Sequence, residues 1–330
     1  MKVVVGDRNL LPHRELFESG LPSGASVSWH RTFDVPAIVA DLGDADVYVG
    51  GRFTAAMAAA APKLRLLHVA GAGTDKVDFD ALPDATLVAN TFHHEDSTAE
   101  YIVSAALMLR RGFLAQDRAL RGDRWATSVY DDEIPQSRSM RGARVGFVGF
   151  GHIGSRAWNL LRAFGADGFA VTGRGTLDAD AEGLEWAGDN ASLTRLMSES
   201  DVVVVSAPLN DHTRGMIGAA ELEALGPDGV LINVGRGPLV REHPLFDALA
   251  SHGIAAAAID VWYTYPDAGG DGAPGALPFR DLPNVLMTPH SSGVTDHTFV
   301  GRVGDITDNI RRLDTGQTVL RTVRPAGVRQ

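Results

Sequence analysis

The sequence predicts an α/β protein with parallel sheets, and three observations support this fold class. Short apolar stretches typical of buried strands alternate with helical stretches along the chain, which is the order that parallel βαβ units require. A glycine-rich turn, Gly149-x-Gly151-x-x-Gly154, stands between a predicted strand and a predicted helix. The chain of 330 residues is long enough for about two domains. We therefore expect two doubly wound parallel sheets.

The first third of the chain reads as a parallel unit of its own. Apolar stretches predict strands, and helical stretches at residues 35–40 and 54–61 fit between them. The predicted strands are residues 2–5, 25–30, 47–49, 64–69 and 86–89.

The strand at 64–69 runs into a second glycine-rich turn, Ala70-Gly-Ala-Gly-Thr-Asp75. This turn has no third glycine and no following helix, which argues against a second nucleotide site. In one interpretation the bare N–H groups of Gly71, Ala72 and Gly73 bind a carboxylate or a phosphonate. In the other, the segment is a tight loop without a ligand.

A polar loop at residues 90–97 leads into a long predicted helix at 98–110, which Ser97 or Thr98 can cap. His93, His94 and Glu95 resemble metal ligands, but neighbouring loop residues rarely converge on one ion, and no third ligand stands at a suitable spacing. We predict no metal site and expect one of these side chains, His94, to face a substrate. Residues 112–140 are weakly periodic and form either an arm that packs on a neighbouring molecule or a surface connection.

The turn at 149–154 has the context of a dinucleotide fingerprint. Val145, Phe147 and Val148 predict a strand before it, and residues 157–164 predict a helix after it. Gly149 permits the tight turn, Gly151 keeps a Cβ away from the pyrophosphate, and Gly154 lets the helix approach the sheet. N–H groups at the helix start, among them those of His152 and Ile153, then bind the phosphates.

The remaining strands complete a second doubly wound sheet from about residue 143 to residue 290. They are predicted at 201–206, 229–233, 254–259 and 285–287, with helices at 192–198, 219–225 and 245–252. A helix at 295–313 and a tail at 316–330 follow.

The phosphate form of the nicotinamide cofactor depends on the end of the second strand of this sheet. An acidic residue about 20 residues past the fingerprint would bind the ribose 2′-hydroxyl of NAD. The segment reads Phe169-Ala-Val-Thr-Gly-Arg174, with Thr172 at the expected position and Arg174 close by. A hydroxyl and a guanidinium suit a 2′-phosphate, so NADP is favoured over NAD. Alternatively, Arg174 is a solvated turn residue and selectivity is lax.

Composition excludes several classes of protein. A formal net charge of −11 argues against binding to nucleic acid or to anionic membranes. The absence of cysteine excludes disulfide scaffolds, thiolate metal sites and cysteine nucleophiles. The apolar run at residues 1–6 is too short for a signal peptide, and no run approaches the ~18 residues of a membrane span. We expect a cytoplasmic protein.

Taken together, the motifs identify a family resemblance that covers nearly the whole chain. The chain resembles the D-isomer-specific 2-hydroxyacid dehydrogenases, which include glyoxylate/hydroxypyruvate reductases and formate and phosphite dehydrogenases. The resemblance implies a Rossmann-type dinucleotide-binding domain, residues 107–295, inserted into a flavodoxin-like substrate domain, residues 1–106 and 296–330. The motifs are Gly71-Ala-Gly73, Thr98-Ala-Glu100, Gly149-x-Gly151-x-x-Gly154, Ala207-Pro-Leu209 with Thr213, Asn233-Val-Gly-Arg-Gly237, Asp260-Val261 and Thr288-Pro-His290.

The resemblance also implies residue roles. Arg236 would bind the substrate carboxylate and polarise the carbonyl. His290 would protonate the carbonyl oxygen as hydride arrives, and act as the base in reverse. Alternatively, Arg236 is a solvated turn residue and His290 a structural loop histidine. Gly71, Ala72 and Gly73 would give N–H groups to the carboxylate, Asp260 would lie near the nicotinamide carboxamide, and the cofactor cleft would include Pro208, Thr213 and Val234.

One residue departs from the family pattern. Most relatives carry a Glu five positions after the Asp260 equivalent, where it hydrogen-bonds the catalytic histidine and raises its pKa. Here Tyr265 holds that place, and formate dehydrogenases depart there too, with a Gln. Because a tyrosine brings no negative charge, we hypothesise a lower pKa of His290 than in those relatives. Asp267, Asp271, Glu95 or Asp296 could supply the missing charge.

The resemblance predicts an oxidoreductase that transfers hydride between NAD(P)H and a small 2-keto acid. The departure at residues 262–266 keeps open another small anion as substrate, such as formate, phosphite or a phosphonate. A non-catalytic NAD(H)-sensing interaction protein is a further alternative. Family members are usually homodimers, which would make residues 112–140 the dimer arm.

Overall fold

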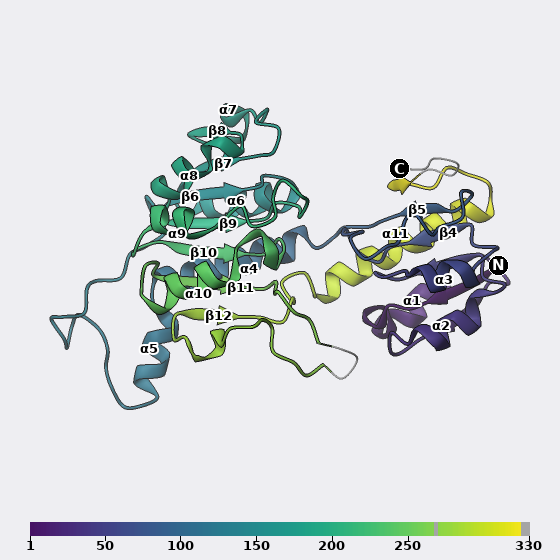
Figure 1. The fold of residues 1–330 in the computed structure, drawn as a ribbon, viewed down its shortest axis with the longest axis horizontal. Helices are drawn as coiled ribbons and strands as arrows, with labels where there is room; N and C mark the ends of the chain where they lie inside the picture. The colour runs from purple at the N-terminus through teal and green to yellow at the C-terminus, as the bar shows by residue number, and fades with distance from the viewer. Residues whose placement is uncertain (267–269, 325–330) are drawn as a thin grey trace. The chain divides into compact units, whose positions relative to one another are not determined.

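The chain forms two compact units, of which the first is discontinuous. The computed structural model describes residues 1–266 and 270–324. Residues 1–93 together with 295–330 make the first unit and residues 94–294 the second. In Figure 1 the purple N-terminal and yellow C-terminal segments accordingly belong to the same unit.

The border between the units differs from the expected one. The sequence placed it after residue 106, whereas the structure places it after residue 93. The reason is the long helix α4 (Glu95–Arg110). Its apolar residues, including Ala99, Ile102 and Ala106, belong to the same buried cluster as the strands of the second unit, so α4 folds with that unit.

The first unit is built on a six-stranded sheet with the order β13-β5-β4-β3-β1-β2. All neighbours are parallel except β13, which runs antiparallel to β5. The five parallel strands thus have the flavodoxin-like order 2-1-3-4-5. They are β1 (Lys2–Val5), β2 (Ser26–Trp29), β3 (Val47–Val49), β4 (Leu66–His68) and β5 (Leu87–Ala89), and the edge strand is β13 (Thr322–Arg324).

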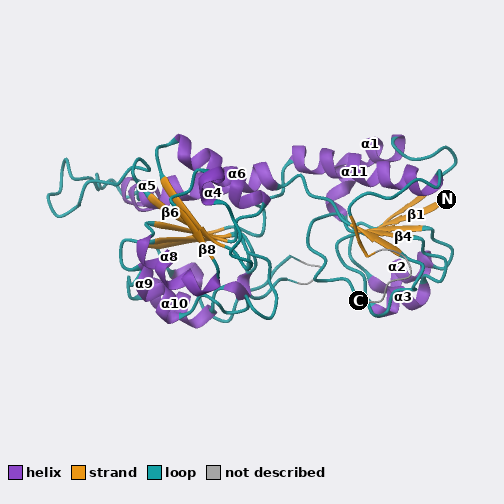
Figure 2. Ribbon diagram, turned by 90° about the horizontal axis from the view of Figure 1, so that it is seen from above, coloured by secondary structure: helices purple, strands orange, loops and turns teal. Residues whose placement is uncertain are grey.

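Successive side chains along each strand point to opposite faces of this sheet, so that apolar residues form two cores, one on each face. Val3 and Val5 of β1 pack in the cluster that contains α11, whereas Val4 packs with α2 and α3. Figure 2 shows α1 and α11 on one face and α2 and α3 on the other. The helices are η1 (Arg8–His13), α1 (Arg14–Ser19), α2 (Val35–Leu42), α3 (Ala55–Ala60) and α11 (Asp296–Asp314).

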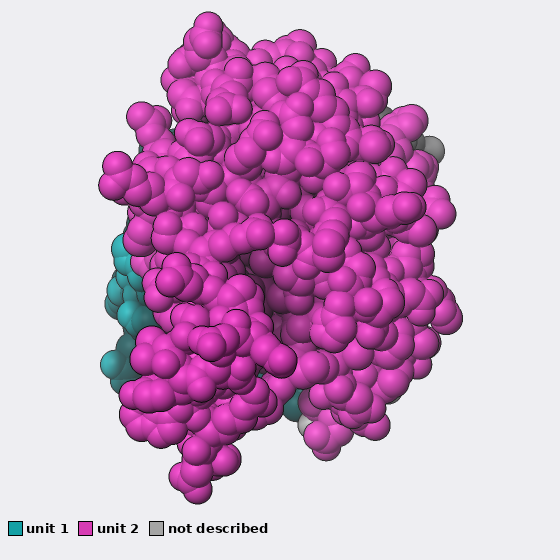
Figure 3. All heavy atoms as spheres, turned by 90° about the vertical axis from the view of Figure 1, so that its left-hand side faces the viewer, with its two compact units in different colours: residues 1–93, 295–330 teal, residues 94–294 magenta. Residues whose placement is uncertain are grey.

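The second unit is a Rossmann-type fold, whose surface is magenta in Figure 3. Its parallel sheet has seven strands in the order β12-β11-β10-β9-β6-β7-β8. Counted from β6, this is the doubly wound order 3-2-1-4-5-6 with one further strand. The strands are β6 (Arg144–Val148), β7 (Asp167–Val171), β8 (Trp186–Gly188), β9 (Val202–Val205), β10 (Val230–Asn233), β11 (Ala256–Ile259) and β12 (Val285–Met287). The expected fold class of two parallel-sheet α/β domains is therefore confirmed.

Helices cover both faces of this sheet, with α4 and α6 on one side and α8, α9 and α10 on the other (Figure 2). Besides α4, they are α5 (Phe113–Leu120), α6 (His152–Ala163), α7 (Ala179–Glu182), α8 (Leu193–Glu199), α9 (Ala219–Leu225) and α10 (Glu242–Ala250), with the short turns η2 (Asn190–Ser192), η3 (Gly237–Leu239) and η4 (Phe279–Asp281). No helix of the described ranges is both long enough and apolar enough to cross a membrane.

Several elements were not expected from the sequence. η1, α1, α5, β8 and β13 are short, and their apolar periodicity is weak. β8, for example, is only Trp-Ala-Gly and is held by its pairing with β7 and by the stacking of Trp186 on Phe169 at 5.3 Å. Beyond α5, the chain extends away from the sheet of its unit as a long loop (Figure 1).

Candidate active site

The fingerprint turn connects β6 to α6 as expected. Gly149 has φ +88°, and a Cβ there would lie 2.6 Å from the backbone nitrogen of Ala207. Only glycine fits, and the turn is thereby packed against the loop that follows β9. At Gly151, by contrast, a Cβ would meet nothing within 4 Å. This open space lies at the start of α6, where the pyrophosphate of a dinucleotide is expected.

The first turn of α6 offers hydrogen-bond donors. No side chain caps this helix. The N–H groups of Gly151 and Ile153 have no acceptor among the residues that the structure describes. Unpaired donors at the positive end of a helix suit an anion. The residues therefore fit the phosphates of a dinucleotide.

The end of β7 carries a positive charge. The Thr172 hydroxyl accepts the N–H of Gly175 at 3.1 Å and so shapes the turn. The Arg174 side chain is exposed and forms no ion pair or hydrogen bond within the described ranges. Arg174 therefore has a guanidinium available for an incoming anionic group.

The loop after β9 has an internal hydrogen-bond network. The Thr213 hydroxyl donates to the carbonyl of Pro208 at 2.7 Å and accepts the N–H of Asn210 at 2.9 Å. Thr213 thus organises the loop, while Pro208 stays exposed and Val234 is buried at the end of β10. Direct cofactor contacts of these residues remain predictions.

The loop after β10 presents Arg236 and is held by Asn233, a motif residue to which the sequence assigned no role. The buried Asn233 side chain accepts the N–H of Gly235 at 3.2 Å and donates to the carbonyl of Arg236 at 3.1 Å. A Cβ on Gly237 would lie 2.4 Å from the carbonyl oxygen of Trp262. The loop of Arg236 therefore packs directly on the loop after β11. An Asn just before a glycine turn was the available signal.

His290 lies in the loop after β12 and meets Tyr265. The Tyr265 hydroxyl is 2.9 Å from Nδ1 of His290 and accepts the N–H of Trp262 at 3.2 Å. Tyrosine thus contacts the histidine from the position where most relatives would carry a glutamate. His290 itself has φ +57°, a left-handed conformation that is uncommon for a residue other than glycine.

Asp260 is buried at the end of β11. Its carboxylate accepts hydrogen bonds from the Thr288 hydroxyl at 2.6 Å, the Ser291 N–H at 2.8 Å and the Ser292 N–H at 3.1 Å. The Tyr101 hydroxyl, from α4, lies 3.0 Å from Thr288 Oγ1, and burial raises the pKa of Tyr101 to about 12. These partners of Asp260 were not foreseen, because they are 28 or more positions away in sequence.

The predicted carboxylate loop belongs to the first unit. Gly71, Ala72 and Gly73 follow β4, and their N–H groups have no acceptor among the described residues. The carbonyls of Gly71 and Ala72 are bound by the Thr91 N–H at 3.2 Å and by the Asn90 amide at 2.9 Å. Hydrogen bonds to its carbonyls thus hold the loop in place, and its N–H groups are available to bind a ligand.

The two adjacent histidines belong to different units. His93 is in the first unit, with Nε2 2.9 Å from the Asp305 carboxylate. His94 is in the second unit at the start of α4, and a Cβ on Gly293 would lie 3.0 Å from its Cβ. His94 therefore lies beside the loop that carries His290. Within the described ranges no cluster of three His, Cys, Asp or Glu residues is arranged to bind a metal.

The carboxylates considered as a replacement for the family glutamate have separate locations. Asp267 is outside the described residues. Asp271 is exposed and Glu95 begins α4. Asp296 lies in the first unit, 3.9 Å from Nε2 of His13.

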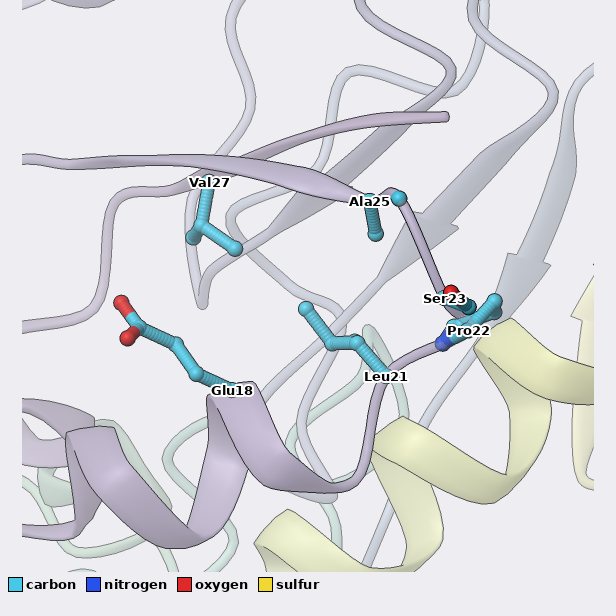
Figure 4. Close-up of a pocket in the computed structure, with 7 residues that line it drawn as sticks. Glu18, Leu21, Pro22, Ser23, Ala25 and Val27 are labelled. Carbon is cyan, nitrogen blue, oxygen red and sulfur yellow. The ribbon is translucent and has the colours of Figure 1, made fainter.

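A surface hollow of the first unit contains none of the predicted site residues. It lies between α1 and β2 and is lined by small and apolar side chains and by Glu18 (Figure 4). We assign no role in the reaction to it.

Comparison with known proteins agrees with this geometry. Residues 103–292 match the family model described as D-isomer specific 2-hydroxyacid dehydrogenase, NAD binding domain. D-3-phosphoglycerate dehydrogenase of Escherichia coli (strain K12) is 35% identical over 239 residues, which are 72% of this chain and 55% of that protein. The chain thus spans about half the length of this curated relative.

Two solved structures match almost the whole chain. A 2-hydroxyacid dehydrogenase from Ketogulonicigenium vulgare Y25 is 26% identical, with a TM-score of 0.79 and coverage of 98% of both chains. An NADPH-dependent glyoxylate/hydroxypyruvate reductase from Sinorhizobium meliloti is 27% identical, with a TM-score of 0.77 and coverage of 100% of this chain and 99% of that chain.

Proposed function

The chain belongs to the D-isomer specific 2-hydroxyacid dehydrogenase family, and from this premise we propose that it reduces a small 2-keto acid to a D-2-hydroxy acid with a nicotinamide cofactor. The observation that carries the proposal is the contact of the Arg236 loop with the loop after β11, which in turn holds His290 through Tyr265. In this proposal, Arg236 binds the substrate carboxylate and His290 donates the proton from adjoining loops of one unit.

Arg236 has two tasks in this reaction. Its planar guanidinium pairs with the substrate carboxylate in a bidentate manner. Its charge also stabilises the negative charge that develops on the carbonyl oxygen. The side chain is half-buried, and Nη1 donates to the carbonyl of Gly235 at 2.9 Å, which restricts the orientation of the guanidinium.

His290 delivers the proton. When bound, the reduced nicotinamide supplies the hydride to the carbonyl carbon. Because Nδ1 faces Tyr265, Nε2 is the nitrogen that we assign to proton transfer. The carbonyl oxygen takes this proton as it becomes a hydroxyl, and His290 is reprotonated from solvent.

Tyr265 supports both charge states of His290. Its oxygen already accepts the N–H of Trp262. Its hydrogen is then available to Nδ1 of a neutral imidazole, which places the ring proton on Nε2. When the imidazole is protonated, the same oxygen accepts the Nδ1–H instead. Unlike a carboxylate, Tyr265 adds no charge that stabilises the imidazolium.

NADPH is the cofactor form that we favour. The support is the guanidinium of Arg174, which has no partner among the residues that the structure describes, and the absence of an acid at the end of β7. A carboxylate there would repel a 2′-phosphate, whereas arginine attracts it. The NADPH-dependent relative from Sinorhizobium meliloti is consistent with this choice.

Turnover assays test the proposed function. Nicotinamide absorbance is followed with NADPH or NADH and a panel of glyoxylate, hydroxypyruvate, pyruvate and phenylpyruvate. We expect turnover with at least one acid, and a loss of about 100-fold or more in kcat/KM for Arg236→Ala. Tight cofactor binding without turnover of any acid would instead support an NAD(H)-sensing interaction protein.

A second candidate substrate class is another small anion. The observation that favours it is Tyr265, which replaces the family glutamate at the proton-transfer residue. Oxidation of formate requires no proton from the histidine, so a weaker proton donor would be tolerated. Formate, phosphite and a phosphonate, each assayed with NADP⁺ and NAD⁺, separate this alternative from keto-acid reduction.

We further propose a homodimer in which the arm after α5 packs on the partner. Its large apolar side chains are exposed, with Trp125 at 62%, Val129 at 76% and Tyr130 at 69%. Trp125 and Tyr130 contact each other edge to face at 5.7 Å. An exposed aromatic pair on an extended segment is typical of a protein interface.

A further inference from the structure

Arg302 of α11 places a positive charge beside the loop after β4. A Cβ on Gly71 would lie 3.9 Å from Nη1 of Arg302, so the guanidinium faces the side of Gly71 that carries no side chain. Both residues belong to the first unit. The N–H groups of Gly71, Ala72 and Gly73 have no acceptor among the described residues. A guanidinium therefore adjoins a loop whose backbone donors are available to an anion.

Two contacts fix the orientation of Arg302. Its Nε donates to the carbonyl of Phe92 at 2.9 Å. Its guanidinium carbon lies 5.1 Å from the centroid of the Phe299 ring, which belongs to the preceding turn of α11 and attracts the cation. The Thr91 N–H and the Asn90 amide bind the carbonyls of the glycine-rich loop. The segment after β5 thus holds both this loop and Arg302.

The charge at this place suits a carboxylate. Asp7, at the end of β1, is the acidic neighbour of Arg302. Burial raises the pKa of the Asp7 carboxyl above its ordinary value, and the positive charge of Arg302 opposes that shift. The Asp7 carboxylate also accepts the N–H of Asn9 at 3.0 Å and caps η1. One guanidinium with an acidic neighbour matches the single charge of a carboxylate better than the nearly two charges of a phosphate.

A substrate with one carboxylate does not need Arg302. The family resemblance gives both Arg236 and the N–H groups of the glycine-rich loop to the carboxylate of the keto acid. A planar guanidinium fork and three N–H groups offer about five donors, whereas a carboxylate has about four acceptor positions. That carboxylate is already satisfied, so the charge of Arg302 is available to another group.

On the basis of the proposed reductase function, we propose that Arg302 is a specificity-determining residue that binds a second carboxylate of the substrate. The substrate class is then a dicarboxylic 2-keto acid. The terminal N–H groups of the guanidinium pair with the distal carboxylate, while Nε stays bound to the carbonyl of Phe92. A keto acid with an apolar tail leaves this charge unused.

Matched pairs of keto acids test this substrate class. 2-Oxoglutarate and 2-oxopentanoate have the same chain length and differ in the distal carboxylate, as do oxaloacetate and 2-oxobutanoate. With NADPH and the wild-type protein, we expect kcat/KM to be about 10-fold higher for the dicarboxylate in at least one pair, because a hydrogen bond to a charged group has about this strength. Equal or lower values for the dicarboxylates in both pairs would overturn the proposal.

The Arg302→Met variant shows whether Arg302 causes this preference. We expect the ratio of kcat/KM for the dicarboxylate to that for its matched monocarboxylate to fall about 10-fold. Arg311→Met is the matched control, because Arg311 is an exposed cation of the same helix that donates to the carbonyl of Gly20 at 3.0 Å. This control should leave the ratio as it is. An unchanged ratio in Arg302→Met would show that Arg302 does not bind the distal carboxylate.

Inhibition of the wild-type protein tests the same site if Arg302→Met fails to fold. Glutarate and pentanoate cannot be reduced, and only glutarate has two carboxylates. We expect glutarate to compete with the keto acid with a Ki about 10-fold lower than that of pentanoate. Equal Ki values would overturn the proposal.

Two further results have separate meanings. A higher kcat/KM for phosphohydroxypyruvate than for both dicarboxylates, lost in Arg302→Met, would assign Arg302 to a phosphate and overturn the choice of a carboxylate. Failure of the wild-type protein to turn over any keto acid, with one carboxylate or two, would reject the proposed function itself.

Discussion

The Tyr265 hydroxyl lies 2.9 Å from Nδ1 of His290, and the neighbouring backbone N–H of Trp262 donates to the same hydroxyl at 3.2 Å. The second hydrogen bond fixes the orientation of the phenol. A neutral group therefore orients His290, to which we assign proton transfer, where most relatives are expected to have a carboxylate.

Replacing Tyr265 by glutamate should extend keto-acid reduction to higher pH. In the reaction that we propose, reduction requires a protonated His290 and therefore declines as pH rises through its pKa. A carboxylate next to the imidazole stabilises the imidazolium and therefore raises that pKa. The measurement is the pH profile of kcat/KM for Tyr265→Glu. Tyr265→Phe is the control, because it removes the hydrogen bond without adding charge. An unchanged profile for Tyr265→Glu would contradict the role that we give to Tyr265.

Gly237→Ala should lower activity strongly, although it adds only one methyl group. A Cβ at this position would lie 2.4 Å from the carbonyl oxygen of Trp262, so the loops of Arg236 and Tyr265 must separate. We expect a loss of about 100-fold in kcat/KM. Gly304→Ala is a matched control, since a Cβ there meets nothing within 4 Å. In α11 this change should stabilise the fold by about 0.5–1 kcal/mol. Similar activities of the two variants would refute the predicted loop coupling.

Arg174→Ala should reduce the preference for NADPH over NADH. The guanidinium is exposed and unpaired within the described part of the chain, so its loss removes an attraction that only the 2′-phosphate uses. We expect the KM for NADPH to rise about 10-fold while the KM for NADH changes little. Thr172→Asp should shift selectivity further towards NADH. If both coenzymes were affected equally, Arg174 would not contact the 2′-phosphate.

His68 should make the first unit sensitive to acid. Burial lowers the pKa of His68 from 6.5 to about 4, and its Nε2 accepts the Asn309 amide at 3.0 Å. Between pH 6.5 and about 4, His68 is therefore protonated in the unfolded chain and neutral in the folded chain. Stability from this group is complete above pH 6.5 and is lost as pH falls through this window, by about 2 kcal/mol between pH 7 and pH 5.

Urea unfolding at pH 7 and pH 5 measures this loss. The His68→Gln variant cannot titrate there, so its unfolding free energy should depend less on pH in this range. The same pH dependence in both proteins would show that another group is responsible.

The arm after α5 should control the oligomeric state. Replacing Trp125 and Tyr130 by serine removes two exposed aromatic rings, which are the side chains that interfaces use most. We expect sedimentation velocity to show a dimer for the wild-type chain and a monomer for the double variant. Replacing Leu16, an exposed apolar residue of α1, by serine is the control. A dimer that persists in the double variant would exclude the arm as the principal interface.

The features that could be predicted from the sequence are those with local signatures. The turn between β6 and α6 was predicted from Gly149 and Gly151, because the steric requirements of a tight turn depend on only a few adjacent residues. Tyr265 was located by its spacing from Asp260. Most strands of both sheets, though not β8 and β13, were found because continuous apolar runs mark buried parallel strands.

The features that could not be predicted depend on distant contacts. The hydrogen bonds from Thr288, Ser291 and Ser292 to Asp260 link two separate loops, and no periodicity encodes them. The border after residue 93 was missed because only the packing of α4 determines its unit. β13 was missed because three residues without alternation give no strand signal, and its pairing with β5 defines it.

The discontinuity of the first unit has a consequence for how the chain acquires its structure. Phe299, Val303, Ile306 and Ile310 of α11 complete one of the two cores of that unit, and β13 covers the edge of its sheet. Both elements are translated after the whole second unit. During synthesis, one face of the N-terminal strands is therefore covered only by η1 and α1, and one edge of the sheet is uncovered, while residues 94–294 can already fold. In nascent chains stalled near residue 294, we expect the second unit to resist protease while the first is still cleaved. We also expect chaperones to bind the N-terminal segment of such chains.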